Sequence, residues 1–304
     1  MPTAPVSDAE LSQQVRDYIE YDTNESSRTH LTALLQSNDL SALRSLFVPR
    51  ISFGTAGLRA AMQPGYHNIN APVVMQTTQG LIRYLQSALP DKLPSKGVVV
   101  GYDGRHNSRD WARLTAAVFL SQRIPVRLFS QHCPTPLVPF AIRYHGLAAG
   151  VMITASHNPA ADNGYKLYWH NSAQIIPPHD AHIQQHIEQQ LRPWQHYQLD
   201  ESDALLSDPL DEMMAAYTQL VGEKYCWRRE QNKRTKLRAT YTAMHGVGAP
   251  WAAKAFESAA ETTTESASGW QCTDSQQVTN NCLLPRISCA ERLVCLPTYP
   301  CPSR

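Results

Sequence analysis

The sequence predicts an α/β fold: a three-layer α/β/α domain with a mostly parallel sheet, followed by an incomplete second α/β domain. Between residues 71 and 169, amphipathic segments of helical period alternate with short apolar runs. The connections are short, and this β-α-β-α-β order is typical of parallel sheets with helices on both faces. A chain of 304 residues is long enough for about two domains of ordinary size.

Segments whose apolar residues recur at helical spacing predict the helices. A capping box at residues 7–10 opens the first helix, which runs to about Asp22. The other expected helices are residues 32–47, 73–89, 108–122, 136–145, 179–191, 209–221 and 251–257.

Short apolar runs bounded by turn residues predict the buried strands. They are residues 97–103, 124–129, 148–154 and 164–169. A later run, residues 237–243, is interpreted as the first strand of the second α/β unit. We place the boundary near residues 200–210, so that residues 1–205 form the first domain and residues 206–257 begin the second.

The last segment, residues 258–304, does not resemble the continuation of a βαβ domain. It passes from a run rich in Ala, Ser, Thr and Glu into scattered prolines and cysteines. No Cys-x-x-Cys pair occurs, which argues against a structural zinc site. We expect a poorly ordered tail, and we interpret the break in composition as a sign of a truncated or mis-spliced chain.

Composition excludes several classes of protein. A hydrophobic content of 42% and a charged content of 17% are typical of soluble globular proteins. A net charge of +1 gives no reason to expect a nucleic-acid or membrane partner. Neither an apolar stretch of about eighteen residues nor a secretion signal is present. Only Cys133 and Cys226 precede residue 272, which suits a reducing compartment, so we expect a cytoplasmic protein. Separately from the cysteines, we expect a monomer.

The segment TASHNP, residues 154–159, places a hydroxyl where a predicted strand ends. Open α/β sheets bind ligands at the carboxyl ends of their strands. Ser156 supplies an acceptor hydroxyl, His157 a proton carrier and Lys166 a cation, which together are the parts of a phosphoryl-transfer site. Taken alone, the segment also fits an ordinary turn, because Ser, Asn and Pro are common in turns.

Four segments, in their order and spacing, resemble the α-D-phosphohexomutase superfamily, and within it the eukaryotic phosphoglucomutase/phosphopentomutase branch. They are FGTAGLR (53–59), GYDGRHNS (101–108), CPTP (133–136) and residues 154–169. The resemblance covers residues 52–257 and implies a phosphosugar mutase of carbohydrate metabolism. In such enzymes a phosphoserine phosphorylates a sugar monophosphate, and the bisphosphate returns its other phosphate to the serine. The net result moves a phosphate between the C1 and the C6 or C5 hydroxyl.

The resemblance assigns catalytic roles to residues of this sequence. Ser156 matches the phosphoserine, Lys166 the general acid/base and Arg59 an active-site arginine; His157 is a rival proton carrier or a phosphate contact. A phosphoserine carries about −1.5 to −2 charges at pH 7, so its site must supply positive charge. The pKa of a free lysine is about 10.4 and must be lowered for Lys166 to act as a base.

Further residues are expected to contact the substrate or its phosphate: Gly54, Thr55, Gly57, Asn158 and Arg105. The two glycines would let backbone amides approach an anion. The alternative is a tight turn whose arginine pairs with a carboxylate. Asn158 is also expected to stabilise its loop, and Arg105 with His106 has the alternative of bracing the domain.

The resemblance also implies Mg²⁺, held by the phosphate on Ser156 and by three aspartates of an Asp-x-Asp-x-Asp-Arg loop in the second domain. The sequence has no such loop, and Asp208 and Asp211 are the nearest aspartate pair. The sugar-selecting and distal phosphate-binding loops of the family are absent as well. His179, His182 and His186 recur at helical spacing, but on a polar helix we expect them to be solvated.

Three functional readings follow. The first is a phosphomutase that uses a sugar monophosphate as substrate and glucose 1,6-bisphosphate or a similar activator. The second is a catalytically silent phosphosugar-binding module. The third is a non-functional fragment whose half-built second domain leaves an apolar face uncovered. The choice between hexose and pentose phosphates stays open, because the sugar-selecting region is missing.

Overall fold

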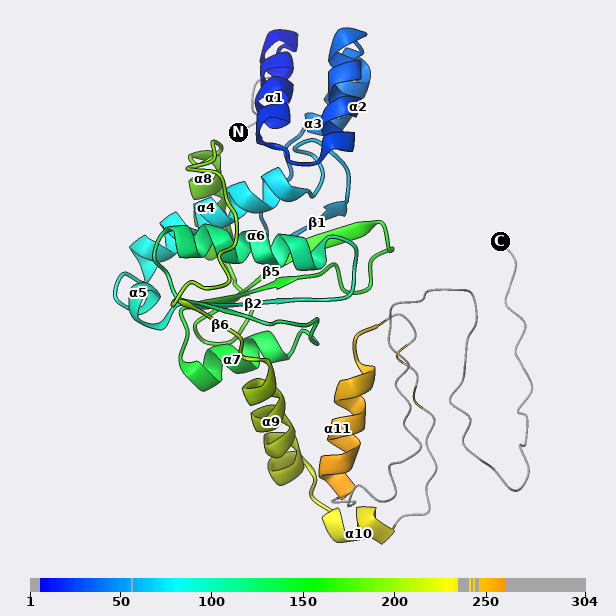
Figure 1. The fold of residues 1–304 in the computed structure, drawn as a ribbon, viewed down its shortest axis with the longest axis vertical. Helices are drawn as coiled ribbons and strands as arrows, with labels where there is room; N and C mark the ends of the chain where they lie inside the picture. Colours follow the sequence, from blue (N-terminus) through cyan, green and yellow to red (C-terminus); the bar gives the residue numbers. More distant parts are fainter. Residues whose placement is uncertain (1–5, 56, 235–240, 242, 244–245, 261–304) are drawn as a thin grey trace, which may run out of the picture.

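A mixed sheet forms the centre of the computed structural model (Figure 1). The structure describes residues 6–55, 57–234, 241, 243 and 246–260. In this part of the chain the sheet has six strands in the order β1-β5-β4-β2-β3-β6. The strands are β1 (Leu58–Ala61), β2 (Val98–Tyr102), β3 (Val126–Leu128), β4 (Ala149–Ile153), β5 (Asp162–Trp169) and β6 (Leu206–Ser207).

The direction of the strands decides where the chain returns. β2, β3 and β4 run parallel, as the sequence predicts, and β6 extends the parallel part. β5 is antiparallel to both β4 and β1. Residues 154–161, between β4 and β5, are too few for a crossover helix, so the chain reverses directly. β5 therefore begins beyond the carboxyl end of β4 and runs antiparallel beside it.

Most helices lie within a few residues of their predicted positions, while α5 and α10 are not predicted. The helices of the described residues are α1 (Asp8–Tyr21), α2 (Glu25–Gln36), α3 (Leu40–Phe47), α4 (Ala71–Ala88), α5 (Lys92–Lys96), α6 (Ser108–Ser121), α7 (Leu137–His145), α8 (His179–Glu188), α9 (Leu210–Leu220), α10 (Arg229–Arg234) and α11 (Ala249–Ala260). A π-helical turn, Val221–Tyr225, follows α9.

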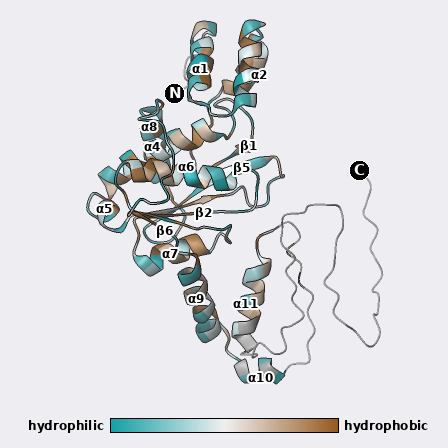
Figure 2. Cartoon of the chain, viewed as in Figure 1, coloured by the Kyte–Doolittle hydropathy of each residue, from teal (hydrophilic) through white to brown (hydrophobic). Residues whose placement is uncertain are grey.

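Helices cover both faces of the sheet, which confirms the three layers. α4, α6 and α8 lie over one face and α7 over the other, where α9 packs against α7 (Figure 1). Side chains of β2 alternate between the two cores, with Val98 and Val100 in one and Val99 in the other. Figure 2 shows hydrophobic residues gathered along the central strands and in α4 and α7.

The single helix expected over residues 32–47 is wrong, because the chain forms α2 and α3 instead. Asn38 between them has φ +53°, in the left-handed region that asparagine tolerates better than most residues. Asp39 then caps α3 by accepting a hydrogen bond from the backbone N–H of Ala42. A local turn and cap thus outweigh an apolar spacing that continues through both helices.

The predicted second unit is only partly described. Its expected strand over residues 237–243 falls mostly outside the described residues, and neither Tyr241 nor Ala243 lies in a strand. The tail, residues 258–304, lies outside the described residues after Ala260 and stays a prediction. The domain boundary near residues 200–210 stays a prediction too; in this stretch β6 pairs with β3 of the first sheet. Among the helices described, none is both long and apolar enough to cross a lipid bilayer.

Candidate active site

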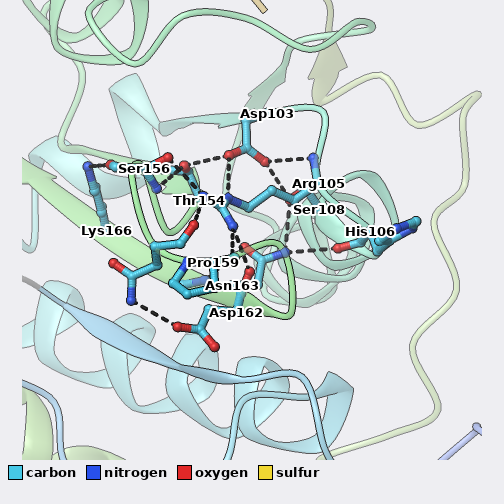
Figure 3. A network of polar contacts seen from close by, with 12 residues as sticks. Asp103, Arg105, His106, Ser108, Thr154, Ser156, Pro159, Asp162, Asn163 and Lys166 are labelled. Carbon is cyan, nitrogen blue, oxygen red and sulfur yellow. Dashed lines mark hydrogen bonds and ion pairs between the residues drawn. The ribbon is translucent and has the colours of Figure 1, made fainter. Parts of the chain in front are cut away.

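Ser156 lies on the loop between β4 and β5, beyond the carboxyl end of β4. Its φ is +56°, in the left-handed region that residues other than glycine rarely adopt, and its side chain is exposed. Lys166 on β5 donates a hydrogen bond of 2.5 Å from Nζ to Ser156 Oγ (Figure 3). Lys166 pairs with Met152 in the antiparallel register, so the chain reversal brings the amine back to the hydroxyl.

The surroundings of Lys166 lower its pKa. Its side chain is buried, with an exposed fraction of 7% for the residue. Burial lowers the pKa of Lys166, and the positive charge of Arg59 lowers it further, while the carboxylate of Asp103 opposes the shift. A lowered pKa increases the fraction of neutral amine at neutral pH, which is the form that can take a proton from Ser156.

Arg59 lies on β1 opposite Gly164 of β5. A Cβ added at Gly164 would lie 3.2 Å from Cγ of Arg59 and 2.6 Å from two backbone oxygens, so a side chain there would crowd the arginine. Among the described residues, Nε of Arg59 is buried without a hydrogen-bond partner. No ion pair to a carboxylate is found for Arg59 in the described part, so this donor can serve an anion.

The turn at Gly54 and Gly57 does not fit the prediction that their amides face an anion. The N–H of Gly57 donates to the carbonyl of Gly54 at 2.8 Å, and the N–H of Gly54 donates back at 3.3 Å. Gly57 has φ +78°, and a Cβ on it would lie 1.9 Å from the carbonyl oxygen of Tyr165. Thr55 is exposed at the tip. The turn therefore holds the start of β1 against β5. This also sets the position of Arg59, the second residue of β1.

Arg105 does not fit its predicted role in phosphate binding, because its N–H groups are already engaged. Nη1 donates to the carbonyls of Pro159 at 2.7 Å and Asp162 at 3.0 Å. Nη2 donates to the carbonyls of Ser156 and Asn158, both at 2.8 Å. Nε lies 3.3 Å from Oδ2 of Asp103 (Figure 3). These contacts favour the bracing alternative.

Asp103 belongs to the hydrogen-bond network around Ser156, but the sequence analysis did not single it out as a site residue. Its Oδ2 accepts a hydrogen bond of 2.6 Å from Thr154 Oγ1, which in turn accepts one of 2.8 Å from the backbone N–H of Ser156. Its Oδ1 accepts hydrogen bonds from Ser108 Oγ and from the backbone N–H of Arg105. An aspartate directly after a buried strand, before Gly-Arg, was the available signal.

The remaining predicted residues border the loop. His157 is exposed. Asn158 donates a hydrogen bond of 3.0 Å from Nδ2 to Oδ2 of Asp162, so it stabilises the loop. The ring of His106 points away from Ser156 and Lys166 (Figure 3). Its carbonyl accepts a hydrogen bond from Nδ2 of the buried Asn163, a structural contact.

The described residues do not fit a Mg²⁺ site. This ion needs several oxygen ligands, with carboxylates among them. Within the described ranges, no three His, Cys, Asp or Glu side chains gather in a way that could hold a metal ion. Near Ser156, Asp103 is engaged in its network and Asp162 accepts a hydrogen bond from Asn158. A phosphate on Ser156 has no carboxylate partners for a metal in this part of the chain.

The histidines of α8 surround Tyr84 instead of a metal. Nδ1 of His179 lies 2.6 Å from the hydroxyl of Tyr84, and the rings of His182 and His186 have their centroids 5.8 and 5.7 Å from the tyrosine ring. The expectation that all three are solvated is therefore incomplete, because His179 is hydrogen-bonded to Tyr84.

Known proteins are similar to this chain in sequence. The family described as "Phosphoglucomutase/phosphomannomutase, alpha/beta/alpha domain I" matches residues 50–193. Human phosphopentomutase is 44% identical over 259 residues, which are 82% of this chain and 42% of that protein. Human glucose 1,6-bisphosphate synthase is 40% identical over 82% of this chain and 41% of its own length. Phosphoribomutase of Saccharomyces cerevisiae is 39% identical over 79% of this chain and 40% of its own.

Solved structures agree on the fold. The exocytosis-sensitive phosphoprotein pp63/parafusin, a phosphoglucomutase from Paramecium in its open form, gives a TM-score of 0.52 at 20% identity. The match covers 71% of this chain and 42% of that chain. This chain thus spans less than half the length of the relatives it matches. Its motifs, fold and relatives together place the chain in the α-D-phosphohexomutase superfamily, in the eukaryotic phosphoglucomutase/phosphopentomutase branch.

Proposed function

We propose that this chain carries the phosphoserine half of a phosphosugar mutase, with Ser156 as the residue that accepts and donates the phosphate. The observation that carries the proposal is the contact between Ser156 Oγ and Nζ of a buried lysine with a lowered pKa. An exposed hydroxyl next to such an amine is an activated nucleophile. The names of the relatives, phosphopentomutase and phosphoribomutase among them, support a sugar phosphate as the substrate.

The residues present account for one half-reaction. Ser156 Oγ forms a bond to the phosphorus of a sugar bisphosphate while the bond from phosphorus to the sugar oxygen breaks. Lys166 takes the proton of the serine hydroxyl and returns it to the departing sugar oxygen, so charge and protons balance. The free donor of Arg59 stabilises the negative charge on the phosphoryl oxygens. The reverse sequence phosphorylates the other hydroxyl of the sugar.

Within the described residues no group of carboxylates is placed to hold Mg²⁺, so no step of this half-reaction is assigned to the metal. The metal and the glucose 1,6-bisphosphate activator belong to the proposal by similarity to the family. Metal ligands would have to come from outside the part of the chain that the structure describes. A second candidate is a phosphosugar-binding module without turnover.

Intact mass spectrometry tests the proposal directly. The purified chain is incubated with Mg²⁺ and glucose 1,6-bisphosphate, and we expect one added phosphate that peptide mapping assigns to Ser156. Ser156→Ala should take up none. Ser172→Ala is the matched control, because Ser172 also has a positive φ, +67°, but lies in the turn after β5. Unmodified wild-type chain would contradict a phosphoserine role.

Turnover separates the two candidates. Conversion of glucose 1-phosphate or ribose 1-phosphate by the phosphorylated chain supports the mutase and shows which sugar it prefers. Binding of these sugars in calorimetry without conversion supports the binding module. We further propose that the protein is a cytoplasmic monomer, for which light scattering on the purified chain and imaging of the tagged chain in cells are the tests.

A further inference from the structure

The loop that carries Ser156 turns its backbone carbonyls toward a single side chain. Residues 156, 158, 159 and 162 each place a carbonyl oxygen within 3.0 Å of a terminal nitrogen of Arg105. Carbonyl dipoles that converge in this way repel one another, and donors placed between them offset the repulsion. The guanidinium supplies these donors, because it is planar and offers them in a fixed fork.

Asp103 holds the guanidinium from the opposite side. The side chains of Arg105 and Asp103 are 14% and 15% exposed, and Nε of the arginine lies 3.3 Å from Oδ2 of the aspartate. The same oxygen accepts a hydrogen bond from the hydroxyl of Thr154. That hydroxyl in turn accepts a hydrogen bond from the backbone N–H of Ser156. Arg105 thus holds the carbonyl of Ser156, and Asp103 holds its N–H through one hydroxyl.

These contacts fix a strained backbone position of the site, that of Ser156. Ser156 adopts φ +56°, which costs a residue with a Cβ of the order of 1 kcal/mol and persists only when the surroundings enforce it. Both polar groups of its backbone are held by the network of Arg105 and Asp103. Relaxation of this φ would rotate Oγ away from the amine of Lys166.

We propose that Arg105 is a positioning residue, which holds the left-handed backbone of Ser156 so that Oγ meets Lys166, and which does not itself bind the phosphate. Only one part of this proposal, the effect of Arg105 on phosphate uptake by Ser156, rests on the proposed function. Its structural content, the ordering of residues 154–163 by the guanidinium, holds whether or not the chain takes up phosphate.

The test is Arg105→Lys in the full chain, which keeps the charge but loses the planar fork. Hydrogen exchange of the peptide covering residues 154–163 should accelerate about tenfold or more, since several hydrogen bonds from a charged donor are lost. Phosphate uptake by Ser156 from glucose 1,6-bisphosphate should slow by a similar factor. Exchange of the strand β2 should stay unchanged.

Arg44→Lys is the matched control. Arg44 also donates to a backbone carbonyl, that of Val6, and pairs with a carboxylate, that of Asp8, but it lies in the N-terminal helices. It should leave both readouts at the wild-type value. If Arg105→Lys does not fold, Thr154→Val provides the second variant, because it removes only the hydroxyl between Asp103 and Ser156, and it should move both readouts in the same direction by less.

Two outcomes overturn the proposal. Slower phosphate uptake with unchanged loop exchange in Arg105→Lys means that Arg105 acts on the phosphate and not on the loop. If Arg105→Lys keeps the wild-type rates of both loop exchange and phosphate uptake, a positive charge is enough to hold the loop and the planar guanidinium is not needed. If the wild-type chain takes up no phosphate, the phosphoserine role fails, while loop exchange in the same variants still decides the positioning role.

Discussion

Two loops meet at Lys166, and they are held by different means. The loop of residues 154–161 depends on side chains from elsewhere in the chain. Arg105 donates hydrogen bonds to its backbone carbonyls, and Asp103 accepts one from the hydroxyl of Thr154. The turn from Gly54 to Gly57 holds itself through reciprocal backbone hydrogen bonds and packs on β5 because Gly57 has no side chain. The loop with Ser156 is held by an arginine whose N–H groups are all engaged, while the turn leads to Arg59, whose Nε has no partner among the described residues. The two arginines therefore differ in their hydrogen bonding: Arg105 is bonded to the protein, and Arg59 keeps a donor unpaired among the described residues.

The largest expected effect is at Lys166, whose amine contacts Ser156 Oγ. Lys166→Met removes the proton acceptor and should slow phosphate uptake by Ser156 about 10²–10⁴-fold, the usual contribution of general acid–base catalysis. Lys96→Met, an exposed lysine at the end of α5, is the control. In the wild type, the uptake rate should rise with pH through the lowered pKa of Lys166, because the neutral amine is the active form. A flat profile in the wild type would remove Lys166 as the base.

The lowered pKa of Lys166 should also appear in the pH dependence of the free energy of unfolding. Folding lowers the pKa of Lys166, mainly through burial, so the charged ammonium is disfavoured in the folded protein. The cost is present below the folded pKa and disappears as the pH rises toward the ordinary value of about 10.4. Lys166→Met should remove this part of the increase in the free energy of unfolding, as measured by urea titrations at several pH values.

Gly57→Ala tests how the self-held turn is fixed. An added Cβ would sit 1.9 Å from the carbonyl oxygen of Tyr165 at a φ of +78°, so we expect a loss of about 2–4 kcal/mol in the free energy of unfolding. Gly54→Ala is the control in the same turn. Nothing lies within 4 Å of its added Cβ, and its change should stay within about 0.5 kcal/mol. Equal losses in denaturant titrations would show that close packing on β5 is not what requires Gly57.

Arg59→Met asks whether this arginine is the one that faces the anion. It should lower the rate of phosphate uptake about tenfold, by loss of a charged donor. It should also shift the pH profile to higher pH, because the pKa of Lys166 loses the lowering that the charge of Arg59 causes. Loop exchange over residues 154–163 should stay at the wild-type value, in contrast to Arg105→Lys. A faster exchange in Arg59→Met would erase the proposed division between the two arginines.

Asn158→Ala should give the smallest effect on the nucleophile loop. It removes the hydrogen bond to Asp162, which contributes about 1 kcal/mol, while the carbonyl of residue 158 still binds Arg105. Phosphate uptake should fall less than about fivefold. A loss as large as that of Arg105→Lys would mean that the Asn158 amide, and not the guanidinium, is the main brace.

The sequence by itself determined the layers of the fold and the identity of the chemical groups. The spacing of apolar residues along the chain depends only on neighbouring positions. It therefore predicted strands 97–103, 124–129 and 148–154 and the helices between them. A hydroxyl after a strand and a lysine near it were visible in the same local way. The apolar spacing over residues 32–47 wrongly predicted a single helix, although the turn and cap at Ser37-Asn38-Asp39, which prevail in the structure, were also visible in the sequence.

Only the tertiary structure decided how these groups meet. The reversal into β5 puts Nζ of Lys166 on Ser156 Oγ, the amides of Gly54 and Gly57 bond to each other, and Arg105 turns to the loop carbonyls. None of these follows from residue type, because each depends on which backbone donors and acceptors stay unpaired once distant segments have packed. A motif names the side chains of a site, but the directions of the backbone groups around it decide which arginine binds the protein and which is left for the ligand.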